Sequence, residues 1–393
     1  MQFRFTDEQQ MIRDTAASFF ADRSGSAAVR EAMATDTGYD PQLWQRLCQD
    51  LCLHATTIPD AAGGMGLGYV ELVAVMEQMG RYLVCSPFFA TVCQAVPAVL
   101  RTATGAQAVP WLERILAGQT ATLAWIGREQ PGCAAVSAEY EPTDAGYRLS
   151  GEYHFVVDGH SADLLILAAR RPGTSGRYGV SLFAIDAKAA EDAGIERVWT
   201  PTLDQTRHLA RIRLDGLRLD AAACLGSQGM AGAALGEVLQ LATVALAAEQ
   251  MGGAQQVQDM AVAYTGERQQ FGRPIASFQA IKHKAADMML RTEVARSACY
   301  YAACIADEAW RGGVLAGELA EAAAIAKSYC SDAFFSNAAE ALQLHGGVGF
   351  TWEYDVHLYF KRAKASGLML GDASEHRETL AAQLLDGGKT ACS

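Results

Sequence analysis

The feature that most constrains this fold is a long C-terminal stretch of alanine-rich segments with hardly a glycine or proline inside them. Between Met230 and Leu385, apolar residues recur three and four positions apart, which is the spacing of α-helices. In the first of these helices, up to Tyr264, apolar positions wrap around more than one face. Such a helix is expected to be buried among other helices. We therefore predict a C-terminal four-helix bundle.

The rest of the chain divides into two further regions. Residues 1–118 carry helical patterns, such as "PQLWQRLCQDLCLHA" and "YVELVAVMEQMGRYLV", on either side of a Gly-rich loop. Residues 119–226 change to short alternating segments, such as "YRLSGEYHFVVDG", separated by Gly, Pro, Asp and Ser, which predicts an antiparallel β-sheet domain. The order predicts an α+β fold of three domains: N-terminal helical (1–118), middle β (119–226) and C-terminal helical (227–393).

Composition and charge narrow the function classes. Half of the residues are hydrophobic and the formal net charge is −12, which argues against a general nucleic-acid binder. No signal-peptide pattern and no uncharged apolar run long enough to span a bilayer is found, so we expect a cytoplasmic protein without a membrane span. The ten cysteines are scattered without metal-binding spacing, so no metal site is expected.

The first chemical motif is "ERQQFGRPIASFQAIKH", residues 267–283. Arg268 lies at a predicted helix end, Phe271 follows it, and Gln279 begins the next helix. An arginine there can bind a phosphate, and an aromatic ring can cover an adenine or flavin face. Taken alone, the motif also fits an ordinary helix–turn–helix.

The second motif is "QLHGGVG", which contains Gln343, Gly346 and Gly347. Its glycines allow positive φ and close approach of a ligand to the backbone. Exposed N–H groups there suit a phosphate or an adenine edge. A tight interhelical turn without a ligand is the alternative.

Together, "RQQFGRPIASFQAIKHKAADM" and "ALQLHGGVGFTWEYDVHLYFKRAKA" resemble the acyl-CoA dehydrogenase family, and the N-terminal helices are similar as well. The resemblance implies that FAD lies at a subunit interface and takes a hydride from the β-carbon of an acyl-CoA while a carboxylate removes the α-proton. It also implies which residues here hold the pyrophosphate and adenosine of a neighbouring subunit's FAD: Arg268, Phe271, Gln279, Gln343, Gly346 and Gly347.

The sequence departs from the family pattern where the flavin ring is expected. Residues 127–140 lack the usual Thr-Glu-Pro and Gly-Ser-Asp stretches. In the next segment Phe155 and Val156 fit the family pattern, but Val157 replaces a residue with a hydroxyl group. Valine neither donates nor accepts a hydrogen bond, so that contact is lost.

The usual catalytic base is missing too. In most family members a glutamate precedes a glycine near the C-terminus, where this chain has Leu370. A second branch takes its base from the position of Ala242. Asp372 is a candidate replacement, with a helix N-cap as the alternative interpretation. Glu249 is a second carboxylate, for which pairing with a cation of another helix is the favoured interpretation.

The resemblance and its gaps give three hypotheses. In the first, the chain is the subunit without a base in a heterotetrameric acyl-CoA dehydrogenase for bulky or steroid side chains. A sister subunit then supplies the base, and electron-transfer flavoprotein accepts the electrons, as in the family. In the second, the chain forms a homotetrameric enzyme with Asp372 as base. In the third, it is a non-enzymatic acyl-CoA-binding or scaffold protein on this fold. We read His345 and His376 as structural.

Overall fold

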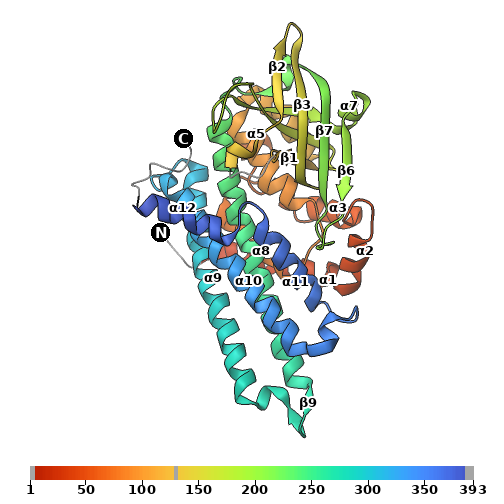
Figure 1. Cartoon of the computed structure of the whole chain (residues 1–393), viewed down its shortest axis with the longest axis vertical. Helices are drawn as coiled ribbons and strands as arrows, with labels where there is room; N and C mark the ends of the chain where they lie inside the picture. The colour runs from red at the N-terminus through yellow and green to blue at the C-terminus, as the bar shows by residue number, and fades with distance from the viewer. Residues whose placement is uncertain (1–4, 128–131, 386–393) are drawn as a thin grey trace. The chain divides into compact units, whose positions relative to one another are not determined.

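The structure, a computed structural model, describes residues 5–127 and 132–385. Its Cα positions group into two compact units. Among the described residues, the first unit holds residues 5–30, Gly68–Val84 and residues 243–385. The second holds Glu31–Leu67, residues 85–127 and residues 132–242. Figure 1 follows the chain through both units.

Helices form both ends of the chain, and a sheet forms its middle (Figure 1). In chain order the helices are α1 (Asp7–Arg23), α2 (Ser26–Met33), α3 (Pro41–Gln49), α4 (Tyr69–Arg81), α5 (Val96–Thr102), α6 (Gly105–Leu116), α7 (Ala187–Asp192), α8 (Gly232–Glu267), α9 (Gln279–Arg311), α10 (Leu319–His345), α11 (Val356–Leu368) and α12 (Ala373–Leu385). The strands are β1 (Ala121–Ala124), β2 (Glu139–Thr143), β3 (Gly146–Val157), β4 (Leu164–Arg170), β5 (Val180–Asp186), β6 (Glu196–Thr200), β7 (Leu209–Asp220), β8 (Cys224–Leu225), β9 (Gln269–Gln270) and β10 (Arg273–Pro274). The predicted α+β fold is confirmed.

The sheet of the second unit is mostly, but not wholly, antiparallel. Among the described residues the strand order is β6-β7-β3-β2-β4-β5-β8, with β1 paired to β4 outside this path. The β1–β4 pair is parallel, from Ala121 opposite Leu164 onward, so the expectation of a purely antiparallel sheet was wrong there. Parallel neighbours need a long crossover connection, and the β2–β3 hairpin lies between these two strands in the chain.

The core of the β unit is built from alternate residues of these strands. Tyr140, Tyr153 and Phe183 are buried in one apolar cluster. The buried Tyr153 hydroxyl donates to the Ala168 carbonyl over 3.0 Å, which satisfies its only polar group. Burial alternates along β7, as the sequence pattern predicts, whereas β1 and β4 are buried along their whole length.

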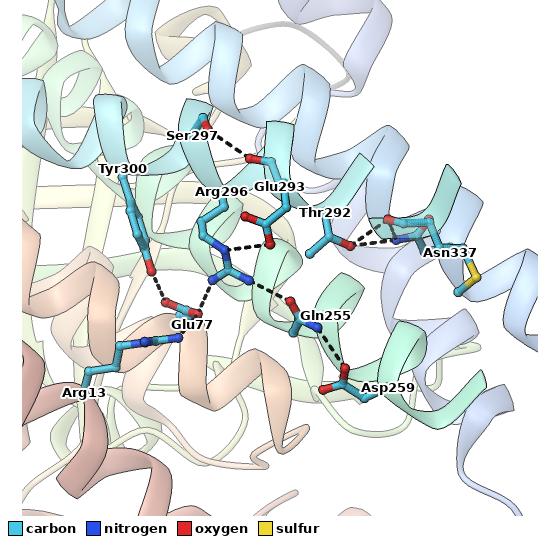
Figure 2. A network of polar contacts seen from close by, with 11 residues as sticks. Arg13, Glu77, Gln255, Asp259, Thr292, Glu293, Arg296, Ser297, Tyr300 and Asn337 are labelled. Carbon is cyan, nitrogen blue, oxygen red and sulfur yellow. Dashed lines mark hydrogen bonds and ion pairs between the residues drawn. The ribbon is translucent and has the colours of Figure 1, made fainter. Parts of the chain in front are cut away.

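Helices α1, α4 and α9 of the first unit meet around a buried carboxylate, Glu77 of α4 (Figure 2). Glu77 Oε1 accepts from Arg13 of α1 over 3.0 Å and from Arg296 of α9 over 2.8 Å, and Oε2 accepts from Tyr300 over 2.7 Å. Arg296 also donates to Gln255 of α8 over 2.7 Å. Burial, and then the Glu77 charge, raises the pKa of the Tyr300 hydroxyl, which therefore stays a donor. The Glu77 carboxylate thus joins three helices, and Arg296 connects them to a fourth, α8.

Helix α8 is the one described helix that is long and apolar enough to cross a membrane by length and composition. Its most apolar window has a mean hydropathy of 1.2, and 72% of that window is buried inside the structure. A core helix of this kind passes the same test, and burial is what the wrap-around apolar pattern of α8 predicts.

Candidate functional site

The first predicted motif forms a tight hairpin after α8. Strands β9 and β10 pair with Gln270 opposite Arg273, so Phe271 and Gly272 form a two-residue turn. Both have positive φ, 54° and 76°, as a type I′ turn requires. Phe271 is nevertheless 91% exposed. A bulky residue held in the left-handed region and left in solvent is a mark of a contact surface rather than of a stable turn.

The hairpin is anchored to both helices that it connects. The Arg268 backbone N–H donates to the Tyr264 carbonyl over 2.9 Å, and the Arg268 carbonyl accepts from Ile275 over 2.8 Å. The Arg273 guanidinium lies 4.1 Å above the Phe278 ring, directly before α9. The Arg268 side chain is exposed and forms no ion pair with the described part of the chain. Its charge is therefore available to an external anion.

The second motif is the turn that ends α10. Gly346 has φ +64° and caps the helix, so a glycine is favoured there by backbone conformation. At Gly347 φ is not in this region, and an added Cβ would meet nothing within 4 Å. Neither backbone conformation nor internal packing requires Gly347, whereas a ligand close to the backbone would. Gln343 is exposed one turn earlier.

Aromatic contacts bring the two motifs to the same end of the helical bundle (Figure 1). The rings of Tyr264, on α8, and His345, on α10, stack with centroids 4.2 Å apart. Lys284 of α9 and Glu340 of α10 form an ion pair nearby. The end of α8, the start of α9 and the end of α10 therefore lie together, and with them all six residues that the sequence selects.

His345 is structural, as expected. Its Nδ1 lies 2.7 Å from the Ala341 carbonyl, and burial lowers the pKa of the ring. The neutral ring is therefore the form that stacks on Tyr264.

Position 370 lies in the short turn between α11 and α12. Leu370 has φ +58° and is followed by Gly371 with φ +93°. Its side chain is half-buried and has no ionisable group. Ala242, at the other usual base position, is fully buried in α8 and is equally inert.

Asp372 forms the N-cap of α12. Its Oδ1 accepts the backbone N–H groups of Ser374 and Glu375 over 2.8 and 2.9 Å, while Glu375 Oε2 accepts the Asp372 N–H over 2.8 Å. These bonds, first the one from Glu375, lower the pKa of Asp372. The cap interpretation is confirmed. A carboxylate held in this way is a weaker proton acceptor than a desolvated one.

Glu249 pairs with a cation of another helix, as expected. Its Oε1 lies 2.9 Å from Arg362 Nη1 of α11, and both side chains are buried. A charge neutralised by a direct partner is not poised to take a proton from a substrate.

In the β unit, the segment expected near the flavin ring ends β3. Phe155 is exposed and has φ +55°, within an irregularity of the β3–β7 pairing. Val156 and Val157 are buried, and the Thr122 hydroxyl donates to the Val157 carbonyl over 2.6 Å. Of the other flavin-ring segment, residues 127–140, positions 128–131 lie outside the described residues.

Sequence reasoning missed Lys327, in the middle of α10. This lysine is fully buried, and burial lowers the pKa of its ammonium to about 8. The signal was a single lysine within the alanine-rich run "AEAAAIAKSYC". A buried lysine needs polar partners, and two of the three partners of Lys327 lie outside α10.

Comparison with known proteins decides the family. Residues 6–119 match the acyl-CoA dehydrogenase N-terminal domain, and residues 228–385 match the acyl-CoA dehydrogenase C-terminal domain. Acyl-CoA dehydrogenase IpdE2 of Mycobacterium tuberculosis is 33% identical over 369 residues, which cover 94% of this chain and 95% of that protein. The chain belongs to the acyl-CoA dehydrogenase family.

Two solved structures share the fold over nearly the whole length. The ChsE4–ChsE5 complex from Mycobacterium tuberculosis gives a TM-score of 0.85 at 26% identity, covering 98% of this chain and 99% of the matched one. The structure of the Tcur3481–Tcur3483 steroid ACAD (acyl-CoA dehydrogenase), in a G363A variant, gives a TM-score of 0.83 at 29% identity, covering 98% of this chain and 99% of the matched one. The predicted family, its fold, its oxidoreductase class and its cofactor FAD are confirmed.

The residues at the bundle end fit the adenosine and pyrophosphate portion of FAD. Arg268 offers an exposed cation for a phosphate, Phe271 an exposed ring for a base, and Gln279 and Gln343 exposed amides. The open space at Gly347 admits a ligand against the backbone. These individual roles remain predictions.

Proposed function

We propose that this chain is the subunit without a catalytic base in a two-subunit, FAD-dependent acyl-CoA dehydrogenase. One observation carries the proposal: the side chains suited to the FAD adenosine and pyrophosphate are present and exposed, while Leu370 and Ala242 occupy the usual base positions. The sister subunit supplies the base and the flavin-ring contacts. This chain supplies Arg268, Phe271 and the Gly-rich turn.

The reaction needs two events at neighbouring carbons of the acyl group. A base removes the α-proton of the thioester, a hydride leaves the β-carbon, and a double bond forms between the two carbons. FAD, when bound, supplies the hydride acceptor. In this chain Arg268 balances phosphate charge, and Phe271 covers an apolar ring face. Neither Leu370 nor Ala242 takes part in proton transfer.

The names of the similar structures support a bulky acyl group in the substrate and an assembly of two different subunits. One matching chain comes from the ChsE4–ChsE5 complex and another from the Tcur3481–Tcur3483 steroid ACAD. We infer a steroid-derived acyl-CoA as the substrate class. Electron-transfer flavoprotein is the electron acceptor that the family resemblance implies.

The test is the flavin absorbance of this protein, purified alone and after co-expression with a candidate sister acyl-CoA dehydrogenase chain. We expect a colourless protein alone and a yellow equimolar complex with one FAD per pair. The complex then oxidises a steroid-derived acyl-CoA faster than butyryl-CoA. A homomeric protein that binds FAD stoichiometrically and oxidises acyl-CoA would overturn the proposal.

A matched pair of arginine variants tests the half-site within that complex. Arg268→Ala is expected to weaken FAD binding about tenfold or more, because a charge-assisted bond contributes roughly 1.5–3 kcal/mol. Arg46→Ala removes an exposed arginine of α3 and is expected to leave FAD binding unchanged. Equal FAD affinity in both variants would contradict the assignment of Arg268. A complex without flavin in any preparation would instead favour the scaffold alternative.

A further inference from the structure

Lys327 of α10 holds the turn that carries Leu370. The buried Nζ donates to Ser331 Oγ over 3.1 Å, to the Gly367 carbonyl over 3.1 Å and to the Gly371 carbonyl over 2.9 Å. An ammonium has three N–H groups, and all three are satisfied here. Two of the acceptors are backbone carbonyls on either side of Leu370.

The backbone between these carbonyls is in an unfavourable conformation for leucine. A non-glycine residue at φ +58° is strained, and such strain persists only where the surroundings over-determine it. From α12, His376 Nε2 donates to the Leu370 carbonyl over 2.9 Å, and Asp372 caps the helix. The contacts from α10 and α12 set this conformation, and none of them involves the Leu370 side chain.

The charges around Lys327 show that it does not serve as an ordinary ion-pair partner. Asp332 of α10, Asp372 at the N-cap of α12 and Glu375 of α12 act on the ammonium as more distant negative charges. Cys330 and His376 lie in its surroundings. The three hydrogen bonds nevertheless go to a hydroxyl and two carbonyls. A lysine used in this way fixes backbone position.

We propose that Lys327 is a positioning residue, and that the turn it holds already has the backbone conformation that would place a base at position 370. The leucine side chain is then the one feature of this turn that prevents proton transfer, because the backbone that would present a carboxylate is intact. The inference rests on the proposed function, and it adds that position 370 borders the acyl-CoA in the complex.

The positioning role of Lys327 is tested by hydrogen–deuterium exchange on the full chain, without any partner. Lys327→Met is expected to speed amide exchange at least about tenfold in residues 366–376, because the carbonyls lose their donor. Exchange in residues 292–306 of α9 stays unchanged. Lys364→Met, which removes an exposed lysine of α11, is the matched control and leaves both segments unchanged.

If Lys327→Met does not fold, Lys327→Gln serves in its place, since it keeps a short donor without the charge. Unchanged exchange in residues 366–376 would overturn the positioning role of Lys327. An equal increase of exchange in α9 would also overturn it, because Lys327 would then support the whole helical bundle.

The chemical half is tested by Leu370→Glu, with Leu370→Gln as control, in the co-expressed complex incubated with a steroid-derived acyl-CoA in D₂O. The new carboxylate removes an α-proton and returns a deuteron, so no oxidant is consumed. We expect Leu370→Glu to incorporate more deuterium at the α-carbon than the wild type does. Leu370→Gln should incorporate as much as the wild type, and so should the double variant Leu370→Glu with Lys327→Met.

If Leu370→Glu does not increase deuterium incorporation, the turn does not place a base at the substrate. If the increase persists when Lys327→Met is added, Lys327 does not position the turn. Failure of the proposed function shows separately, as a wild-type complex that holds no flavin.

Discussion

Single residues with positive φ coincide with the positions that the family resemblance assigns to chemistry. Among the described residues six non-glycine side chains have positive φ, and three of them are Phe155, Phe271 and Leu370. Phe155 lies in the flavin-ring segment, Phe271 in the adenosine motif and Leu370 at the usual base position. Strain of this kind is held in place at functional sites.

At Asp372 the geometry gives a definite expectation. Asp372→Asn should leave the turnover of the complex within about twofold of wild type and stability within about 1 kcal/mol, because asparagine caps a helix as well as aspartate. Asp372→Ala should lose about 1 kcal/mol of stability through loss of the cap. Turnover assays and urea unfolding measure both effects. Loss of activity in Asp372→Asn with flavin still bound would support the homotetrameric alternative.

His345 makes stability depend on pH in the acid range. Burial lowers its folded pKa below the ordinary value of 6.5, so the unfolded chain binds the proton more readily. The contribution of neutral His345 to the unfolding free energy is present above pH 6.5 and is lost as the pH falls through the folded pKa. His345→Phe keeps the ring on Tyr264 but cannot titrate. The unfolding free energy of the wild type should therefore fall more steeply than that of His345→Phe as the pH falls below 6.5. Parallel curves would contradict this account.

Among the elements, the β9–β10 hairpin concentrates the cofactor half-site. It connects two long helices by a two-residue turn and leaves Phe271 in solvent. Because Phe271 packs so little within its own chain, its expected contribution is to a ligand or partner rather than to folding.

Phe271→Ala should weaken FAD binding to the complex about threefold to tenfold, the size of an aromatic stacking contribution. The stability of the isolated chain should not change. Val314→Ala is a matched control, since Val314 is equally exposed in the α9–α10 connection, and should affect neither property. Thermal unfolding and FAD titration give the two readouts. Unaltered FAD affinity in Phe271→Ala would remove this residue from the site.

At the scale of the whole molecule, the buried charge of Glu77 connects helices of the helical unit. Glu77 accepts from two arginines and a tyrosine on α1 and α9, and Arg296 extends the network to α8 (Figure 2). Glu77→Ala leaves both guanidinium groups without their shared partner, so we expect a loss of about 3–5 kcal/mol of unfolding free energy. Glu340→Ala breaks a more exposed pair with Lys284 and should cost about 1 kcal/mol or less. Equal losses would refute the role of the network.

The sequence alone determined the order of helices, sheet and helices, the two nucleotide motifs and the absence of a carboxylate at positions 370 and 242. These features depend on local periodicity, on turn residues and on side-chain identity, which can be read position by position. It also predicted that Glu249 pairs with a cation, but not that the cation is Arg362.

Only the tertiary structure decided which distant groups meet. Lys327 contacts carbonyls 40 and 44 residues further along the chain, Glu77 joins α4 to α1 and α9, and β1 pairs with β4 in parallel. Periodicity shows which face of an element is buried, but it does not show what that face is packed against. The partners of buried polar groups follow from that packing, because an unsatisfied charge in the core is too costly to leave.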